Sequence, residues 1–199
     1  MSYAIEQLFV SKLYYTVVSD YQVINNQIEQ RIDEVDFQYT SKWGKTHLLS
    51  GFGKDVIKKH RFDLLSKAID KHLENYCSEL NFKKIKYNRT SWISKFSPGD
   101  YAHVHGHADV DIAGVYYYKT NKEDGNLYFQ TPNPHLESSL CYVDQGQRWR
   151  HFPEEGKLLL FPGWLNHGVT TNETEDTRMS ISFNIIFHHD AFSTGTAMK

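Results

Sequence analysis

A run of nine residues, from position 103 to position 111, concentrates side chains that can bind a metal. Every second residue in it is a histidine or an aspartate: His103, His105, His107, Asp109 and Asp111. Side chains at i and i+2 of an extended strand point to the same face, so the run can direct these groups toward one point. His107 and Asp109 form His-x-Asp, two of the three ligands in a two-histidine, one-carboxylate iron(II) site.

A third ligand has to come from a distant segment, and His167 is the candidate. An apolar strand is expected over 157–161, a Pro162-Gly163 turn follows it, and His167 opens the next short strand. Trp164 indicates that this turn is packed rather than solvated, and a rigid strand end suits a metal ligand. Two pairings with His167 stay open at this point: His107 with Asp109, or His105 with His107.

A cationic residue follows the third candidate ligand along the sequence. Arg178 lies eleven positions after His167 and opens a strand in which Arg178, Ser180 and Ser182 share one face. An arginine that faces the inside of a β-barrel is costly unless it meets an anion. A guanidinium with a neighbouring hydroxyl suits the carboxylate of a ligand.

The elements that must position these residues are helical first and then β. Apolar residues at helical spacing predict helices from about 20 to 32 and from 61 to 79. Period-two patterns and turn residues predict strands at 5–18, 85–96, 112–118, 127–129, 157–161, 169–171 and 179–187. Segments 43–53 and 132–147 are expected to be loops. We therefore predict an α+β, mostly β, single domain over 1–199, with a supporting part at 1–82 and a β-sandwich or small barrel at 83–190.

Composition excludes several classes of protein. The 199 residues carry a formal net charge of −2, which implies no general attraction to nucleic acid or to an anionic membrane. No apolar run approaches the length of a membrane span. The two cysteines, Cys77 and Cys141, are expected to be reduced thiols. We expect a cytoplasmic protein, and the sequence makes no prediction of its oligomeric state.

Taken together, the chain resembles the 2-oxoglutarate- and iron(II)-dependent oxygenases. More narrowly, it is similar to a group of oxygenases found in marine bacteria and cyanophages, whose core reads Pro-Gly-Asp-Tyr, then His-x-His, then Ser-Gly-Val-Tyr-Tyr. The matching segments are 98–101, 105–107, 113–117, 161–167 and 178–184. Leu8-Phe9 and the loop around Trp43 also fit, so the resemblance covers nearly the whole chain. It implies a double-stranded β-helix (jelly-roll, cupin-like) fold.

The resemblance also implies which residues hold the metal. Many relatives have His-x-His without an acid two residues later, whereas this chain has Asp109. The junction after His107 resembles that of penicillin-synthase-like oxygenases, so we prefer His107, Asp109 and His167 as iron(II) ligands, with His105 as the alternative. A carboxylate ligand argues against halogenation, which related enzymes perform when a small residue replaces the acid.

For the co-substrate, the resemblance implies that Arg178 and Ser180 bind the distal carboxylate of 2-oxoglutarate. If Gly114 faces the interior, Tyr116 and Tyr118 do so as well and can assist. Four further residues are expected to contact the metal ligands or the substrate: His105, Asp111, Asn184 and Trp164.

The expected reaction is hydroxylation of a small-molecule or peptide substrate with release of succinate and CO₂. The loop from 132 to 150, which contains Tyr142 and Trp149, is the candidate lid. The alternatives are a cupin-like metal-binding protein, or a metal-dependent isomerase or hydrolase, without oxygenase activity. Arg178-x-Ser180 favours the oxygenase, because those alternatives have no need of an anchor for a keto acid.

Overall fold

The structure, a computed structural model, describes residues 4, 10–39, 46–51, 54–83, 86–133, 135–136 and 149–188. Some of the predictions above therefore lie outside the described residues. They are the predictions that concern Leu8-Phe9, Trp43, Cys141 and Tyr142.

Helices and short strands come first along the chain, and the main strands follow. The first elements are β1 (Tyr14–Val17), α1 (Tyr21–Glu29), the 3-10 helix η1 (Ile32–Glu34), β2 (Phe37–Gln38), β3 (Leu48–Ser50), α2 (Val56–Lys59) and α3 (Asp63–Glu79). The later elements are β4 (Tyr87–Phe96), β5 (Ala102–His105), β6 (Ile112–Lys119), β7 (Leu127–Phe129), β8 (Trp149–His151), β9 (Lys157–Pro162), β10 (His167–Val169) and β11 (Arg178–Phe187).

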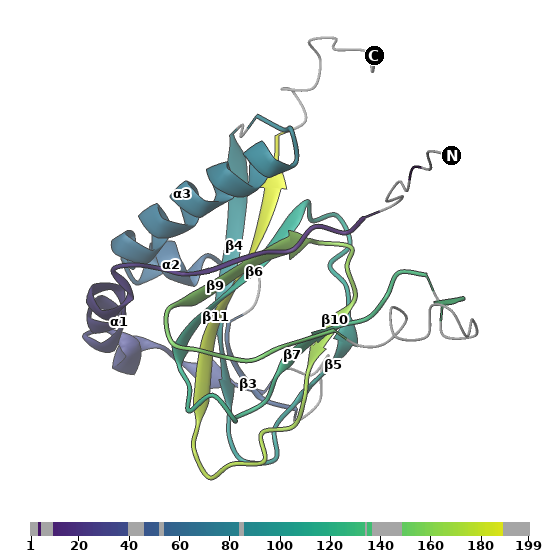
Figure 1. Cartoon of the computed structure of the whole chain (residues 1–199). Helices are drawn as coiled ribbons and strands as arrows, with labels where there is room; N and C mark the ends of the chain where they lie inside the picture. The colour runs from purple at the N-terminus through teal and green to yellow at the C-terminus, as the bar shows by residue number, and fades with distance from the viewer. Residues whose placement is uncertain are drawn as a thin grey trace.

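Two antiparallel sheets pack against each other. The larger sheet has the strand order β1-β9-β6-β11-β4-β3-β2, and the smaller sheet has the order β5-β10-β7-β8. The helices lie together on one face of the larger sheet, away from β5, β7 and β10 (Figure 1). This confirms the predicted fold class, a mostly β double-stranded β-helix core supported by N-terminal helices.

The larger sheet is buried on both faces, and β6 shows this most clearly. Seven consecutive residues from Ile112 to Tyr118 are buried. Tyr116 and Tyr118 belong to the apolar cluster on the helix side, whereas Val115 and Tyr117 belong to the cluster between the two sheets. The alternation of side chains along this strand therefore divides them between two cores.

The longest helix follows the predicted pattern closely. Its buried side chains include Leu65, Ile69, Leu73 and Tyr76, which recur at intervals of three and four residues. That spacing places them on one face of α3, which packs on the sheet.

No helix in the described part of the chain is both long and apolar enough to cross a membrane.

β3 lies within the segment predicted to be a loop. It spans three residues, too few for a period-two pattern to be recognised. Its structure depends on pairing with β4, where Leu48 lies opposite Lys95 and Leu49 opposite Ser94. This tertiary pairing has no local signal in the sequence, and it brings the residue before β3, His47, to the interior of the protein.

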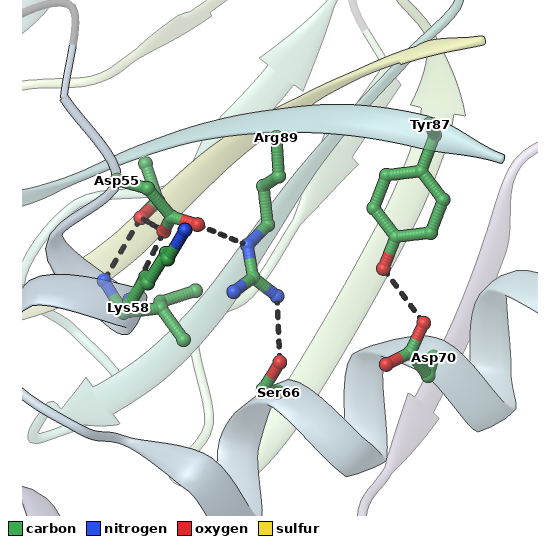
Figure 2. A network of polar contacts seen from close by, with 8 residues as sticks. Asp55, Lys58, Ser66, Asp70, Tyr87 and Arg89 are labelled. Atoms are coloured by element: carbon green, nitrogen blue, oxygen red, sulfur yellow. Dashed lines mark hydrogen bonds and ion pairs between the residues drawn. The ribbon is translucent and has the colours of Figure 1, made fainter. Parts of the chain in front are cut away.

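A polar network joins the helices to the larger sheet (Figure 2). Asp55, just before α2, accepts hydrogen bonds from Arg89 Nε at 3.1 Å and from Ser91 Oγ at 2.5 Å, both on β4. Arg89 Nη1 also donates to Ser66 Oγ of α3 at 3.0 Å. The Arg89 and Asp55 side chains are only 9% and 16% exposed, so each needs the other as a partner.

We expect the substitution Asp55→Ala to lower the free energy of unfolding by about 3 kcal/mol, because it leaves the Arg89 guanidinium buried without a counter-charge. Urea unfolding followed by circular dichroism measures this. Asp63→Ala is the control, since Asp63 pairs with Arg61 on the surface, with side chains 54% and 70% exposed. This control should cost no more than about 1 kcal/mol. Equal losses in the two variants would contradict a structural role for the network.

Candidate active site

Three histidines come together where the end of β5 meets the beginning of β10. His105 is the last residue of β5, His107 lies two residues later, and His167 opens β10, where it pairs with His105. One ring nitrogen of each lies within 4.8 Å of the others. The ring centroids are 4.5 Å apart for His105 and His167, 5.2 Å for His105 and His107, and 5.1 Å for His107 and His167.

The same nitrogen of each ring is turned toward a hydrogen-bond acceptor. Nδ1 lies 2.8 Å from the His103 carbonyl in His105, 2.6 Å from Asn184 Oδ1 in His107, and 2.8 Å from the Leu165 carbonyl in His167. Each Nδ1 therefore carries the proton and donates it, which leaves the lone pair on Nε2. Metal-bound histidines are held by their second nitrogen in this way.

Burial keeps these imidazoles neutral. Desolvation lowers the pKa of His107 to about 4 and that of His167 to about 3, and it also lowers the pKa of His105. The buried Nε2 of His107 has no hydrogen-bond partner among the described residues. A buried lone pair without a partner is costly, and a metal ion would satisfy it. The group therefore fits a metal that accepts nitrogen ligands, such as iron(II).

Asp109, one of the ligands preferred from the sequence, lies outside this group of histidines. It is exposed and has a positive φ of 61°. The alternation that would have aligned it with the histidines requires an extended strand, but β5 ends at His105 and the chain then turns. The structure groups His105 with His107 and His167, which is the alternative set.

A close backbone approach fixes His107 beyond the end of β5. His107 N donates to the Gly163 carbonyl at 2.9 Å, and Gly163 N donates to the Asp111 carbonyl at 3.1 Å. A Cβ atom at Gly163 would lie 2.1 Å from the Val110 carbonyl oxygen, so only glycine allows this contact. The Pro162-Gly163 turn, predicted from the sequence, thus holds the loop that carries His107.

The histidines open into a cavity of about 290 Å³ between the two sheets. One wall is a row of polar side chains along β11: Arg178, Ser180, Ser182 and Asn184. Asn184, predicted to lie near the metal ligands, does so through its bond to His107. No aspartate or glutamate among the described residues lines the cavity.

Arg178 lies at the other end of this row and is almost completely buried, with 1% exposure. Its Nη1 donates to the Gly125 carbonyl at 2.9 Å, and its guanidinium packs 4.2 Å from the centre of the Phe96 ring. Its Nε has no partner, and it forms no ion pair with any described residue. Burial lowers the pKa of Arg178, while nearby Tyr117 and Asp124 raise it. A buried guanidinium in this state is suited to an anionic ligand.

Tyr116 and Tyr118, predicted to assist in binding 2-oxoglutarate, do not line the cavity. The position of Gly114 shows which side of the sheet alternate residues of β6 face. A Cβ atom at Gly114 would lie 2.3 Å from Phe183, which belongs to the apolar cluster on the helix side. Tyr116 and Tyr118 point to the same side, and the Tyr116 hydroxyl donates to Asn25 Oδ1 at 2.7 Å. Tyr117 faces inward instead, with its ring centre 5.7 Å from the Arg178 guanidinium.

The other residues predicted to contact the metal ligands or the substrate are mostly exposed. Asp111 is exposed, and its carboxylate accepts a bond from the Phe187 amide at 2.7 Å, which is a structural role. Trp164 is 55% exposed and Trp149 is 68% exposed. His103 is also exposed and packs against Tyr101 rather than joining the three histidines.

Two aromatic residues of the site were not singled out from the sequence. Trp92 of β4 stacks on His107 with 6.0 Å between ring centres. The period-two run through Trp92, Ser94 and Phe96 was a usable signal, since all three line the cavity. His47 also lines it, stacked on Phe96 at 4.4 Å, but no local pattern in its predicted loop marks it.

Comparisons with known proteins concern the family and the fold of the chain. Residues 90–184 match the family described as "Putative 2OG-Fe(II) oxygenase", and this stretch contains all three histidines and Arg178. A search of the curated proteins finds no match to the sequence.

Solved structures of low sequence identity share the fold. A prolyl-4-hydroxylase from Pseudomonas putida is 13% identical with a TM-score of 0.63, and the match covers 91% of this chain and 95% of that chain. HygX from Streptomyces hygroscopicus, with nickel and 2-oxoglutarate bound, is 14% identical with a TM-score of 0.62 and coverages of 90% and 84%. The epimerase SnoN from nogalamycin biosynthesis is 10% identical with a TM-score of 0.65 and coverages of 89% and 79%. The chain thus shares its fold with these solved structures, and its segment 90–184 is similar to the family of 2OG-Fe(II) oxygenases.

Proposed function

We propose that the protein binds iron(II) through Nε2 of His105, His107 and His167, anchors 2-oxoglutarate through Arg178, and hydroxylates a small-molecule or peptide substrate. One observation carries this proposal. A group of neutral, largely buried imidazoles and a buried guanidinium that forms no ion pair with a described residue face the same cavity. The first needs a cation and the second needs an anion, and a metal with a dicarboxylate supplies both.

Each residue has a defined task in this proposal. Asn184 and two backbone carbonyls orient the three imidazoles, so that little reorganisation is needed when the metal binds. Arg178 receives the distal carboxylate, and Ser180 lies on the same inner face of β11 to add a hydroxyl. The bound metal and keto acid supply oxygen activation, with succinate and CO₂ as co-products. The apolar cavity walls exclude water.

The similar proteins support the choice of substrate classes. One is a prolyl-4-hydroxylase, and another was crystallised with nickel, 2-oxoglutarate and hygromycin B. A peptide or a small metabolite is therefore the proposed substrate, without a role for nucleic acid or membrane. A cytoplasmic location is part of the proposal and rests on the expectation that Cys77 and Cys141 are reduced thiols.

We expect the purified protein to produce succinate slowly from 2-oxoglutarate when iron(II) and oxygen are present, even without its substrate. Omission of iron(II) should remove the product, and so should an added chelator. Succinate measured by mass spectrometry is the readout. A protein that binds iron(II) but neither binds 2-oxoglutarate nor forms succinate would instead be a cupin-like metal-binding protein.

A further inference from the structure

A fourth histidine lines the same cavity without belonging to the metal-binding group. His47 lies directly before β3, is 8% exposed, and is separate from His105, His107 and His167. Its ring is parallel to that of Phe96, at 6° and 4.4 Å between centres. A buried polar side chain at a ligand cavity requires a partner for each of its polar atoms.

The strand register relates His47 to the co-substrate anchor. Leu48 pairs with Lys95, and Arg178 pairs with Phe96. Extended by one residue, the first pairing places His47 beside Phe96. His47, Phe96 and Arg178 therefore stand side by side across β3, β4 and β11, with the Phe96 ring in contact with both neighbours.

His47 also lies within electrostatic range of both ends of the cavity. Arg178 and His105 each contribute to lowering its pKa, although burial is the largest cause, and the pKa is about 4. The imidazole is therefore neutral, and it lines the cavity that the three histidines and Arg178 also line.

The inner edge of the ring has a partner in either neutral tautomer. Nδ1 lies 3.2 Å from the Tyr101 carbonyl, which accepts a bond when Nδ1 is protonated. It also lies 3.0 Å from Thr46 Oγ1, which can donate when Nδ1 is bare. The Nε2 atom can therefore carry the proton without leaving Nδ1 unsatisfied. No described residue is bonded to Nε2 of His47.

We propose that His47 is a second anchor for 2-oxoglutarate, donating an Nε2–H hydrogen bond to one of its carboxylate oxygens. This inference rests on the proposed function. The cavity lining is mainly apolar, and its only side-chain hydroxyls among the described residues are those of Ser94 on β4 and of Ser180 and Ser182 on β11. A bond from a neutral donor to a carboxylate is charge-assisted and stronger than a neutral pair.

The test is the dissociation constant of 2-oxoglutarate, measured by calorimetry on protein loaded with nickel(II), which does not turn over. His47→Phe keeps the stack on Phe96 and removes the donor, and we expect affinity to fall about 10-fold. His47→Gln keeps an N–H near the position of Nε2 and should recover most of that loss. Thr46→Val destabilises the required tautomer from outside the cavity and should weaken binding several-fold, by about half the effect of His47→Phe in free energy.

Two results would overturn the inference. One is wild-type affinity in His47→Phe, and the other is a His47→Gln variant as weak as His47→Phe, which would indicate a packing effect. Nickel stoichiometry and thermal midpoint, measured on each variant, show whether the metal group and the fold are intact. If instead the wild-type protein fails to bind 2-oxoglutarate, the proposed function itself fails, so the two failures are distinguishable.

Discussion

Replacing His105 with alanine should lower the affinity for iron(II) by about 100-fold or more, since loss of a residue that merely orients a ligand already costs 10- to 100-fold. The physical reason is that His105 Nε2 is one of only three protein ligands in the group. Competition with a chromophoric chelator under anaerobic conditions measures the change. Circular dichroism of the variant should be that of the wild type, because His105 is at the end of a short strand.

Asp109→Ala is the matched control for His105→Ala. The two residues are four positions apart, and the sequence made them rival ligands. Asp109 is exposed and outside the histidine group, so its removal should leave the iron(II) affinity within about 2-fold of the wild type. The reverse pattern, with affinity lost in Asp109→Ala and kept in His105→Ala, would restore the two-histidine, one-carboxylate assignment.

Replacing Arg178 with alanine should weaken 2-oxoglutarate binding by about 100-fold, because truncating one partner of a buried charge pair costs 2–5 kcal/mol or more. Iron(II) affinity should not change, since Arg178 does not belong to the histidine group. The fold should also be retained, because the substitution removes a buried charge that forms no ion pair with a described residue. Calorimetric titration of 2-oxoglutarate into nickel-loaded protein gives its affinity and stoichiometry, and competition with a chromophoric chelator gives the iron(II) affinity.

Arg89 provides the control for a buried arginine elsewhere in the larger sheet. It is paired with Asp55 on the helix side (Figure 2), so Arg89→Ala should lower stability but leave the affinity for 2-oxoglutarate unchanged. Arg178→Lys should recover only part of the binding, because an ammonium lacks the planar fork that pairs with both carboxylate oxygens. Full affinity in Arg178→Ala would remove this residue from its proposed role.

A set of three histidine ligands carries no charge, whereas a set of two histidines and one carboxylate carries one negative charge. A neutral ligand set leaves the full charge of a divalent metal in the cavity, whose described lining contains no acid. The two carboxylates of 2-oxoglutarate would then be the main compensation, one near the metal and one near Arg178. This makes binding of the metal and binding of the co-substrate mutually favourable in the proposed site.

The sequence predicted the parts of the site that depend on strand ends and turns. His167 follows a Pro-Gly turn, and Arg178 begins a strand with a clear period of two, so both positions were readable. The choice between His105 and Asp109 was not readable, because it depends on where β5 ends and on the close contact at Gly163. Both features depend on contacts between distant segments, and they interrupt the alternation of side chains that the local sequence predicts.

Two other discrepancies have similar causes. β6 is buried on both faces, so no polar residue reveals which tyrosines point between the two sheets, and Tyr117 rather than Tyr116 does so. His47 enters the site through the pairing of a three-residue strand. The helix predicted over 61–79 was accurate because its apolar spacing is long and regular. The narrower resemblance to oxygenases of marine bacteria and cyanophages stays a prediction.

A crystal structure of the protein with nickel(II) and 2-oxoglutarate bound tests the central claim most directly. We predict a metal bonded to Nε2 of His105, His107 and His167, with the distal carboxylate of 2-oxoglutarate paired to Arg178. An Asp109 carboxylate in the coordination sphere would contradict the three-histidine site. A 2-oxoglutarate molecule bound away from Arg178 would contradict the proposed anchor.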